Sequence, residues 1–336
     1  MNKPARIIPR TPRPKHARDW QQRLAEAVDS ASDLDHRLGL APRAAAATGE
    51  FRVRVPEGFL ARMQPGDPDD PLLRQVFPDP REDESRAGYT TDPLAEQQAM
   101  AGPGLLQKYP GRALLTLTGA CAIHCRYCFR RHFPYAEASP RGERWRAVLD
   151  YLQSHPDIEE IILSGGDPLT LADARLAGYL TDLEGIAHLQ RLRLHTRTPV
   201  VLPERVTPAL LDGLHRTRFQ AVVVLHVNHA RELDAAARDA VAALRATGAL
   251  LLNQAVLLAG VNDSVAALEQ LGRALVEAGV LPYYLHQLDP VQGAAHFAVG
   301  DARAQELVTA LQARNSGYLV PRLVREIPGE AGKTPL

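Results

Sequence analysis

Residues 121–133 read CAIHCRYCFRRHF and place three thiols, Cys121, Cys125 and Cys128, in a C-x3-C-x2-C spacing. The chain of 336 residues has three cysteines in all, so its whole thiol complement lies within this stretch. Thiolates bind soft metals and iron–sulfur clusters, and a closed protein site for either usually has four ligands. Three thiols therefore leave one coordination position open, where a substrate or cofactor can bind.

The same thiols could instead form a structural zinc site closed by His124 or His132, or they could be buried thiols grouped by chance. Zinc ribbons and fingers bring a second pair of ligands from elsewhere in the chain. No cysteine lies outside residues 121–128, so a second thiol pair is absent. The number of ligands and their spacing therefore favour a centre that does chemistry over a structural metal.

The composition argues against two classes of protein. Lysine and arginine together number 39, as do aspartate and glutamate, and this zero net charge argues against a nucleic-acid-binding protein. The longest apolar run, residues 248–261, is short for a membrane span and is interrupted by Asn253 and Gln254. Three clustered thiols with no partners elsewhere predict a reducing compartment, the cytoplasm.

The first part of the sequence predicts a mostly helical N-terminal extension, residues 1–102. Residues 1–18 are basic and carry four prolines, which predicts a loose or extended arm rather than a secretory signal. Apolar residues at helical spacing predict one helix from a cap at Asp19 towards Leu38. Residues 66–93 are rich in proline and acid, and they predict extended chain that wraps a surface rather than entering the core.

From a boundary near Pro103, residues 103–336 alternate short apolar runs with helix-length segments, a pattern typical of parallel βαβ units. Six such units, followed by an apolar run at residues 318–324, are too few for an eight-stranded barrel of about 250 residues. We therefore expect an α/β fold with a partial (β/α)6 barrel, and an open doubly wound sheet is the alternative. The six expected strands are RALLTLT (112–118), EEIILSGG (159–166), LQRLRLHTR (189–197), QAVVVLHVNH (220–229), ALLLNQAVLL (249–258) and LPYYLHQLD (281–289).

Polar residues cluster where these strands end. In parallel barrels the active site lies at the carboxyl ends of the strands, and the three cysteines directly follow the first strand. The placement predicts one site at that edge of the barrel. Its other expected members are Gly165, Gly166 and Asp167 after the second strand, His226 and Asn228 after the fourth, and Asp289 after the sixth.

The cysteine motif, with Tyr127 as the aromatic residue in C-x3-C-x-aromatic-C, resembles the signature of radical S-adenosylmethionine (SAM) enzymes. That resemblance implies that the three thiolates hold a 4Fe-4S cluster and that SAM chelates the fourth iron. It also implies that Gly165, Gly166 and Asp167, in LSGGDPLT, bind the methionine part of SAM. Two glycines without side chains let the backbone approach such a ligand.

The terminal segment IPGEAGKTPL, residues 327–336, narrows the resemblance to the lysine 2,3-aminomutase family, whose P-G-x-x-G-K-T-P segment carries a pyridoxal phosphate (PLP) lysine. The match implies that Lys333 holds PLP as a Schiff base. Arg112 and Lys108 match basic positions of the family that bind the PLP phosphate. The segments HTRTPVVLPERVT, HVNH and NQAVLLAGVNDS also resemble the family and are expected to line the nucleoside and substrate pockets.

The resemblance also assigns the substrate contacts. Arg130 matches the residue that holds the substrate carboxylate, to which a planar guanidinium can make paired hydrogen bonds. Asp289 matches a carboxylate that recognises the distant ammonium group of lysine, and Glu326 stands where catabolic members carry aspartate. Glu326 and a chain end three residues after Lys333 are shared with members that make β-lysine for elongation factor P (EF-P).

These matches imply an isomerase that converts L-α-lysine to (R)-β-lysine by radical amino migration and supplies it for modification of EF-P by a separate lysyl ligase. One alternative is an aminomutase for arginine or, less favourably, glutamate, whose carboxylate Asp289 and Glu326 would repel. A second is a non-catalytic iron–sulfur redox sensor or scaffold, which would have no use for Lys333. No nucleic-acid or membrane partner is expected.

Overall fold

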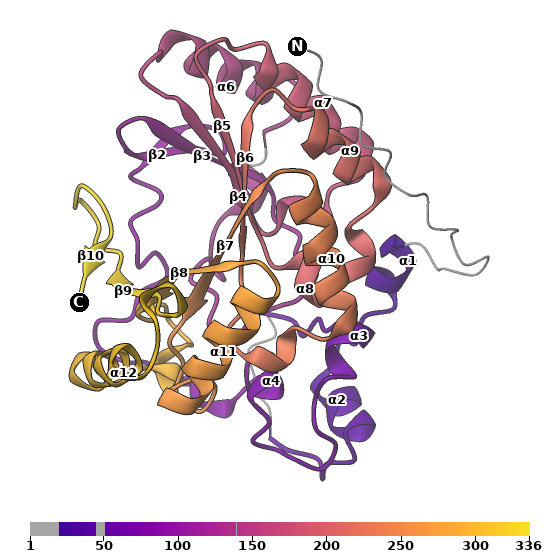
Figure 1. Cartoon of the computed structure of the whole chain (residues 1–336), viewed down its shortest axis with the longest axis vertical. Helices are drawn as coiled ribbons and strands as arrows, with labels where there is room; N and C mark the ends of the chain where they lie inside the picture. Colours follow the sequence, from indigo (N-terminus) through magenta and orange to yellow (C-terminus); the bar gives the residue numbers. More distant parts are fainter. Residues whose placement is uncertain (1–19, 45–50, 139) are drawn as a thin grey trace.

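The protein folds around one ten-stranded sheet whose strands follow one another in the order β1 to β10 (Figure 1). The computed structural model describes residues 20–44, 51–138 and 140–336, so the basic arm expected at residues 1–18 lies outside the described residues. The six central strands are parallel, and the register joins each to the next. They are β3 (Arg112–Thr118), β4 (Glu160–Gly165), β5 (Arg191–Thr196), β6 (Gln220–Leu225), β7 (Leu250–Val256) and β8 (Leu281–His286).

Short strands extend this parallel core at both edges. On one side β2 (Leu105–Tyr109) and β1 (Met100–Gly102) pair antiparallel, and on the other β9 (Arg322–Arg325) pairs parallel with β8. The strand β10 (Thr334–Pro335) closes an antiparallel pair with β9 and carries the end of the chain. Across the described ranges the two edges do not pair, so the expected partial (β/α)6 barrel is confirmed.

Helices cover the outer face of this sheet, as Figure 1 shows. In the helix α10 (Ala235–Ala246), Ala237, Val241 and Leu244 recur at helical spacing and are buried. The Asp234 side chain caps the first turn of this helix. This apolar stripe packs against the apolar sides of the strands and forms the main core. The helices are α6 (Glu143–Ser154), α7 (Asp173–Glu184), α8 (Thr198–Val201), α9 (Pro208–Arg216), α10 (Ala235–Ala246), α11 (Val265–Glu277) and α12 (Asp301–Arg314).

Polar side chains of β5 line the inner face of the sheet, beside buried valines of β6. In β5, Leu192 and Leu194 are buried in the core, whereas Arg191, Arg193 and His195 alternate with them and are half-buried. Because successive side chains of a strand point to opposite faces, these polar residues line the concave side. The inner face is therefore mixed, with arginine and histidine side chains from β5 beside Val222 and Val224 of β6.

In the described residues of the N-terminal part, four short α-helices gather beside α8 and α10 (Figure 1). The prediction of one helix from Asp19 to Leu38 is wrong. The chain leaves the helix after Ala25, Val28 forms an isolated bridge with Val55, and the Ser30 side chain caps a new helix. Cross-chain pairing at Val28 thus overrides the helical spacing of the apolar residues. The helices are α1 (Trp20–Ala25), α2 (Ala31–Arg37), α3 (Glu57–Leu60) and α4 (Pro71–Arg74).

Residues 66–93 do not simply wrap the surface, which corrects the prediction for this segment. Leu72, Leu73 and Val76 are fully buried, and they pack in one cluster with Ala122, from the cysteine loop. Burial of these side chains stabilises the loop that carries the thiols. The boundary expected near Pro103 falls in the turn between β1 and β2, and it remains a prediction. Within the described residues no helix has the length and apolar content to cross a membrane.

Candidate active site

The three thiols lie together in the loop after β3, all reduced and half-buried. Burial and the nearby Cys128 raise the pKa of Cys121 well above its ordinary value. Burial, followed by repulsion from Cys125, raises the pKa of Cys128 to about 11. The thiols are therefore close enough for ionisation of one to disfavour ionisation of the next. A positively charged centre would offset the cost of ionising them.

The three thiols come from one loop and are compatible with a multi-iron cluster. No group of three His, Cys, Asp or Glu side chains in the described part of the chain is arranged to hold a single ion. In a cluster each thiolate can bind a different iron, so the sulfurs need not converge on one point. The two candidate zinc ligands are engaged elsewhere: His124 Nδ1 lies 2.8 Å from the Arg52 carbonyl oxygen and His132 Nε2 lies 3.3 Å from that of Gln292.

Gly165 is the last residue of β4 and Gly166 follows it, and both lie where the backbone packs closely against the chain that enters the cysteine loop. Gly165 has a φ of 118°, and a Cβ there would lie 2.5 Å from the Thr118 carbonyl oxygen. A Cβ on Gly166 would lie 2.3 Å from the carbonyl oxygen of Ala120. Glycine is thus required because the end of β4 packs against the chain entering the cysteine loop. Approach to a ligand, the role expected from the sequence, remains a prediction.

Asp167, which follows these glycines, ties the ends of β4 and β5 together. Its carboxylate accepts hydrogen bonds from the Thr196 hydroxyl at 2.8 Å and from the backbone N–H groups of Leu169, Arg197 and Thr198. Burial raises the pKa of Asp167, and these hydrogen bonds oppose the rise. Both oxygens are engaged by protein groups, so Asp167 positions the loop, and its contact with SAM remains a prediction.

A buried polar network that includes Arg197 supports the cysteine loop from the β5 side. Arg197 Nη1 donates to Cys125 Sγ and to the Tyr127 hydroxyl, each at 2.8 Å. Its Nη2 donates to Gln75 Oε1 at 2.7 Å and to Glu232 Oε2 at 2.9 Å. Sequence reasoning missed the contact with Cys125, because no pattern in HTRTP reveals which cation reaches a sulfur.

Three histidines face the concave side near these groups. Burial lowers the pKa of His195 and His226 well below the usual range, and it lowers that of His286 to about 3. These side chains are therefore neutral at pH 7. His226 Nε2 lies 2.8 Å from the Tyr127 hydroxyl, whereas His195 Nε2 is buried and has no hydrogen-bond partner in the described part of the chain. The sequence pointed to His226 through its place at the end of a strand, which the structure reproduces.

A row of ion pairs with alternating charges lies on the concave face beside Lys333. Arg130 Nε and Nη2 bind Glu96 at 2.6 and 2.8 Å, and Lys108 Nζ lies 3.3 Å from the same carboxylate. Lys108 Nζ is also 2.9 Å from Glu326, which accepts a 2.6 Å hydrogen bond from Lys333 Nζ. Four expected site residues from distant parts of the sequence thus meet, together with Glu96, which sequence reasoning missed.

The charged groups in this row of ion pairs shift one another's pKa values. Burial acts to raise the pKa of Glu326, yet Lys333 and Lys108 lower it to about 2. Burial likewise opposes ionisation of Glu96, but Arg130 and Lys108 hold its pKa below the ordinary value. Burial acts to lower the pKa of Arg130, and Glu96 raises it above the usual range. All three groups are therefore charged at neutral pH.

Asp289 and Arg112 lie beside this row of ion pairs, and neither has an ion-pair partner among the described residues. Burial, followed by repulsion from Glu326, raises the pKa of Asp289 to about 7. Arg112 stacks on Tyr109, with its guanidinium carbon 4.3 Å from the ring centroid. A carboxylate and a guanidinium that no protein charge satisfies are suited to the opposite charges of a ligand.

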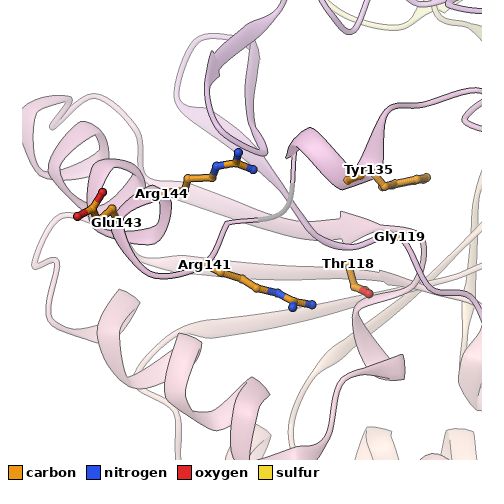
Figure 2. Close-up of a pocket in the computed structure, with 7 residues that line it drawn as sticks. Thr118, Gly119, Tyr135, Arg141, Glu143 and Arg144 are labelled. Carbon is orange, nitrogen blue, oxygen red and sulfur yellow. The ribbon is translucent and has the colours of Figure 1, made fainter.

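A pocket of about 620 Å³ adjoins the end of β4, because its lining residue Tyr135 donates a hydrogen bond to the Gly165 carbonyl oxygen at 2.9 Å (Figure 2). It lies between the end of β3 and the start of α6, and Figure 2 shows Arg141 extending towards Thr118. None of the expected site residues lines it. The expected residues Arg130, Lys108, Glu326 and Lys333 meet on the concave face, which is the candidate site, and the pocket adjoins it at Gly165. The residues that line the pocket are Thr118, Gly119, Tyr135, Ala136, Arg141, Glu143 and Arg144.

Comparison with known proteins agrees with this placement. The model of the Radical SAM superfamily matches residues 115–264, which include the cysteine loop and β4 to β7. The chain is 49% identical to a protein of Escherichia coli named L-lysine 2,3-aminomutase, over 95% of this chain and 94% of that protein. A Haemophilus influenzae protein of the same name is 45% identical over 98% of each.

A solved structure gives a more distant match. A radical SAM methyltransferase from Sphaerobacter thermophilus aligns with a TM-score of 0.47 and 20% identity, over 66% of this chain and 68% of that chain. A likeness of this size has no bearing on the reaction.

Proposed function

The chain belongs to the L-lysine 2,3-aminomutase family of radical SAM enzymes and is an isomerase, and from that premise we propose that it converts L-α-lysine to (R)-β-lysine with PLP bound at Lys333. The single observation that carries the proposal is that Lys333 and Glu326 meet Asp289, which has no ion-pair partner within the described ranges, on the concave face that also bears the cysteine loop. A cation-binding carboxylate beside a candidate Schiff-base lysine favours an amino-acid substrate with a cationic tail.

Radical SAM enzymes use a 4Fe-4S cluster and SAM. In this chain Cys121, Cys125 and Cys128 would hold the cluster, since they supply three thiols and leave one position open. When bound, these groups supply the hydrogen abstraction and return that an amino migration requires. The protein's part is to fix the loop, which the buried contacts of Ala122 and Arg197 support.

PLP would be held by Lys333, with Arg112 and Lys108 as candidates for its phosphate. Lys333 Nζ lies 5.9 Å from the ring centroid of Tyr284, on the concave side of β8. Glu326 has a pKa of about 2, so it holds Nζ by charge and is a poor acceptor for its proton. A phosphate near Lys108 would compete with Glu326 and Glu96 for that ammonium group.

The substrate would be held at both of its ends. Its carboxylate would bind Arg130, in competition with Glu96, and its distant ammonium would bind Asp289. A glutamate tail would be repelled by Asp289 and Glu326, whereas the arginine guanidinium keeps the required charge. Arginine is therefore the alternative substrate that the assay must distinguish.

The product would be used in the cytoplasm for modification of EF-P, with a separate lysyl ligase making the transfer. This part of the proposal rests on the resemblance of PGEAGKTP and on glutamate at position 326. The three unpaired thiols are consistent with a reducing compartment.

The test is an anaerobic assay of cluster-reconstituted, reduced protein with SAM, PLP and one amino acid at a time. L-lysine, L-arginine and L-glutamate are compared, and products are separated by chiral chromatography. We expect (R)-β-lysine from lysine and little or no β-amino acid from the other two. A faster reaction with arginine would reassign the substrate. SAM cleavage without any β-amino acid would reject the aminomutase proposal while leaving the cluster assignment intact.

A further inference from the structure

The contact between Arg197 and Cys125 links a buried cation to one of the three candidate cluster ligands. We propose that Arg197 is a positioning residue that raises the reduction potential of the cluster by donating a hydrogen bond to Cys125 Sγ. The inference rests on the cluster assignment in the proposed function, but not on the amino acid that the enzyme accepts.

The surroundings of Arg197 hold its guanidinium in this position. Its backbone N–H donates to Asp167, and its Nη2 is shared between Gln75 and Glu232. Glu232 is itself fully buried, and it accepts the backbone N–H of Asn228 at 3.0 Å. Because both ends of the contact lie on anchored elements, the Nη1–Sγ distance of 2.8 Å is a fixed feature of the fold rather than a surface encounter.

A second buried arginine near the same loop provides a contrast. Arg126 lies between Cys125 and Cys128 in the sequence, but its guanidinium binds Glu82 and the Phe51 carbonyl oxygen. The ion pair of Arg126 with Glu82 is fully buried, and that of Arg197 with Glu232 is nearly fully buried. Proximity in sequence therefore does not determine which arginine reaches a sulfur; the direction of the side chain does.

The direction of the effect follows from charge. Reduction transfers one electron to the cluster from an external one-electron donor, and no bond between protein atoms forms or breaks. The added negative charge is spread partly onto the ligand sulfurs, where a cationic donor stabilises it more than in the oxidised state. Loss of the Arg197 donor should therefore lower the reduction potential and make reduction harder.

The test compares two double variants that each remove a buried arginine and its buried glutamate and leave net charge unchanged. Arg197→Gln with Glu232→Gln removes the donor to Cys125, and Arg126→Gln with Glu82→Gln is the matched control. The control also removes the contact between Glu82 and Arg131, so it disturbs one more buried ion pair than the Arg197 variant does. Reduction of the reconstituted cluster is followed by electron paramagnetic resonance during a redox titration, without lysine or PLP. We expect the reduced-to-oxidised ratio at fixed potential to fall about tenfold in the first variant, a shift of about 59 mV for one electron, and to change less in the control.

Three results would overturn the inference. Equal shifts in both double variants would show a general effect of disturbing the loop. An unchanged potential in the Arg197 variant, with iron content equal to that of the parent, would show that the contact does not tune the cluster. Failure of this variant and of Arg197→Lys to assemble a cluster that the control assembles would assign Arg197 to assembly instead. Because the readout omits lysine and PLP, a wrong substrate assignment would leave it unaffected.

Discussion

The cysteine side and the lysine side of the concave face are both polar, but they differ in how their charges are satisfied. At the cysteine side, Arg197 and Glu232 are buried and bind each other and neutral partners. At the lysine side, Lys108 and Lys333 retain about a fifth of their side-chain exposure, and Asp289 has no ion-pair partner among the described residues. The first arrangement pairs its charges within the protein, although Arg197 Nε is buried without a hydrogen-bond partner among the described residues. The second has a charge to offer a ligand.

This difference indicates how binding would proceed at each side. A cluster can enter a loop whose supporting contacts are already formed, so little rearrangement of the buried network is needed. At the lysine side an incoming carboxylate must displace Glu96 from Arg130, and an incoming phosphate must compete for Lys108. Under the proposed function, ligand binding there would exchange ion pairs, and the site would discriminate between substrates by charge.

Neutralising one carboxylate at each side should give the largest difference between the two sides, measured as the loss in the free energy of unfolding. Glu232→Gln leaves Arg197 buried without its counter-charge, and we expect the free energy of unfolding to fall by about 3–5 kcal/mol. Glu326→Gln removes contacts with two lysines that keep about a fifth of their exposure, so a smaller loss of about 2 kcal/mol is expected. Chemical denaturation of the metal-free protein under reducing conditions measures both. Equal losses would contradict the distinction between the two sides.

Removal of the unpaired carboxylate should affect binding more than folding. Asp289→Asn should raise the KM for lysine about 30-fold or more, because loss of one partner of a buried charge pair costs about 2–5 kcal/mol. The kcat should change less. Steady-state assays of β-lysine formation measure the split, with exposed Glu330→Gln as the control. An unchanged KM in Asp289→Asn would show that the substrate ammonium binds elsewhere.

A methyl group placed between strand ends tests the rigidity of the cysteine side. Gly166→Ala puts a Cβ 2.3 Å from the Ala120 carbonyl oxygen, so the backbone must shift at a cost of about 1–3 kcal/mol. We expect a lower melting temperature and less bound iron after reconstitution. Gly332→Ala, at the lysine side, has nothing within 4 Å of the added Cβ and should retain the parent's iron content. The distinction fails if both variants lose iron equally.

The titration of Asp289 predicts a pH dependence confined to the lysine side. Its pKa of about 7 means that the carboxylate becomes protonated as the pH falls through 7 and then no longer attracts an ammonium group. The KM for lysine should therefore rise as the pH falls from 8 to 6, by up to about tenfold per pH unit. The slope should disappear in Asp289→Asn. Reduction of the cluster without lysine should not show this transition.

The sequence predicts the barrel well because its signals are local. Alternation within strands such as β5 and the three closely spaced thiols can each be read from a few consecutive residues. The end of the first helix could not be read in this way, since it depends on the pairing of Val28 with distant Val55. Local spacing therefore identified the strands but not the fold of the N-terminal part.

The candidate site divides in the same way. Motif resemblance identified Cys125 and Lys333, but the contacts that organise them join residues far apart in the chain. Arg197 reaches Gln75 across 122 positions, and Glu96 reaches Arg130 across 34. A buried arginine has many possible partners, and only the packed structure selects one.

The most direct test of the account measures both sides of the concave face in one experiment. Reduced, cluster-reconstituted parent, Cys125→Ala and Lys333→Ala proteins are given SAM, PLP and L-lysine, and SAM cleavage and β-lysine are recorded from the same samples. We predict (R)-β-lysine from the parent, neither product from Cys125→Ala, and SAM cleavage without β-lysine from Lys333→Ala. Formation of β-lysine by Lys333→Ala, or its absence from a parent that cleaves SAM, would contradict the account.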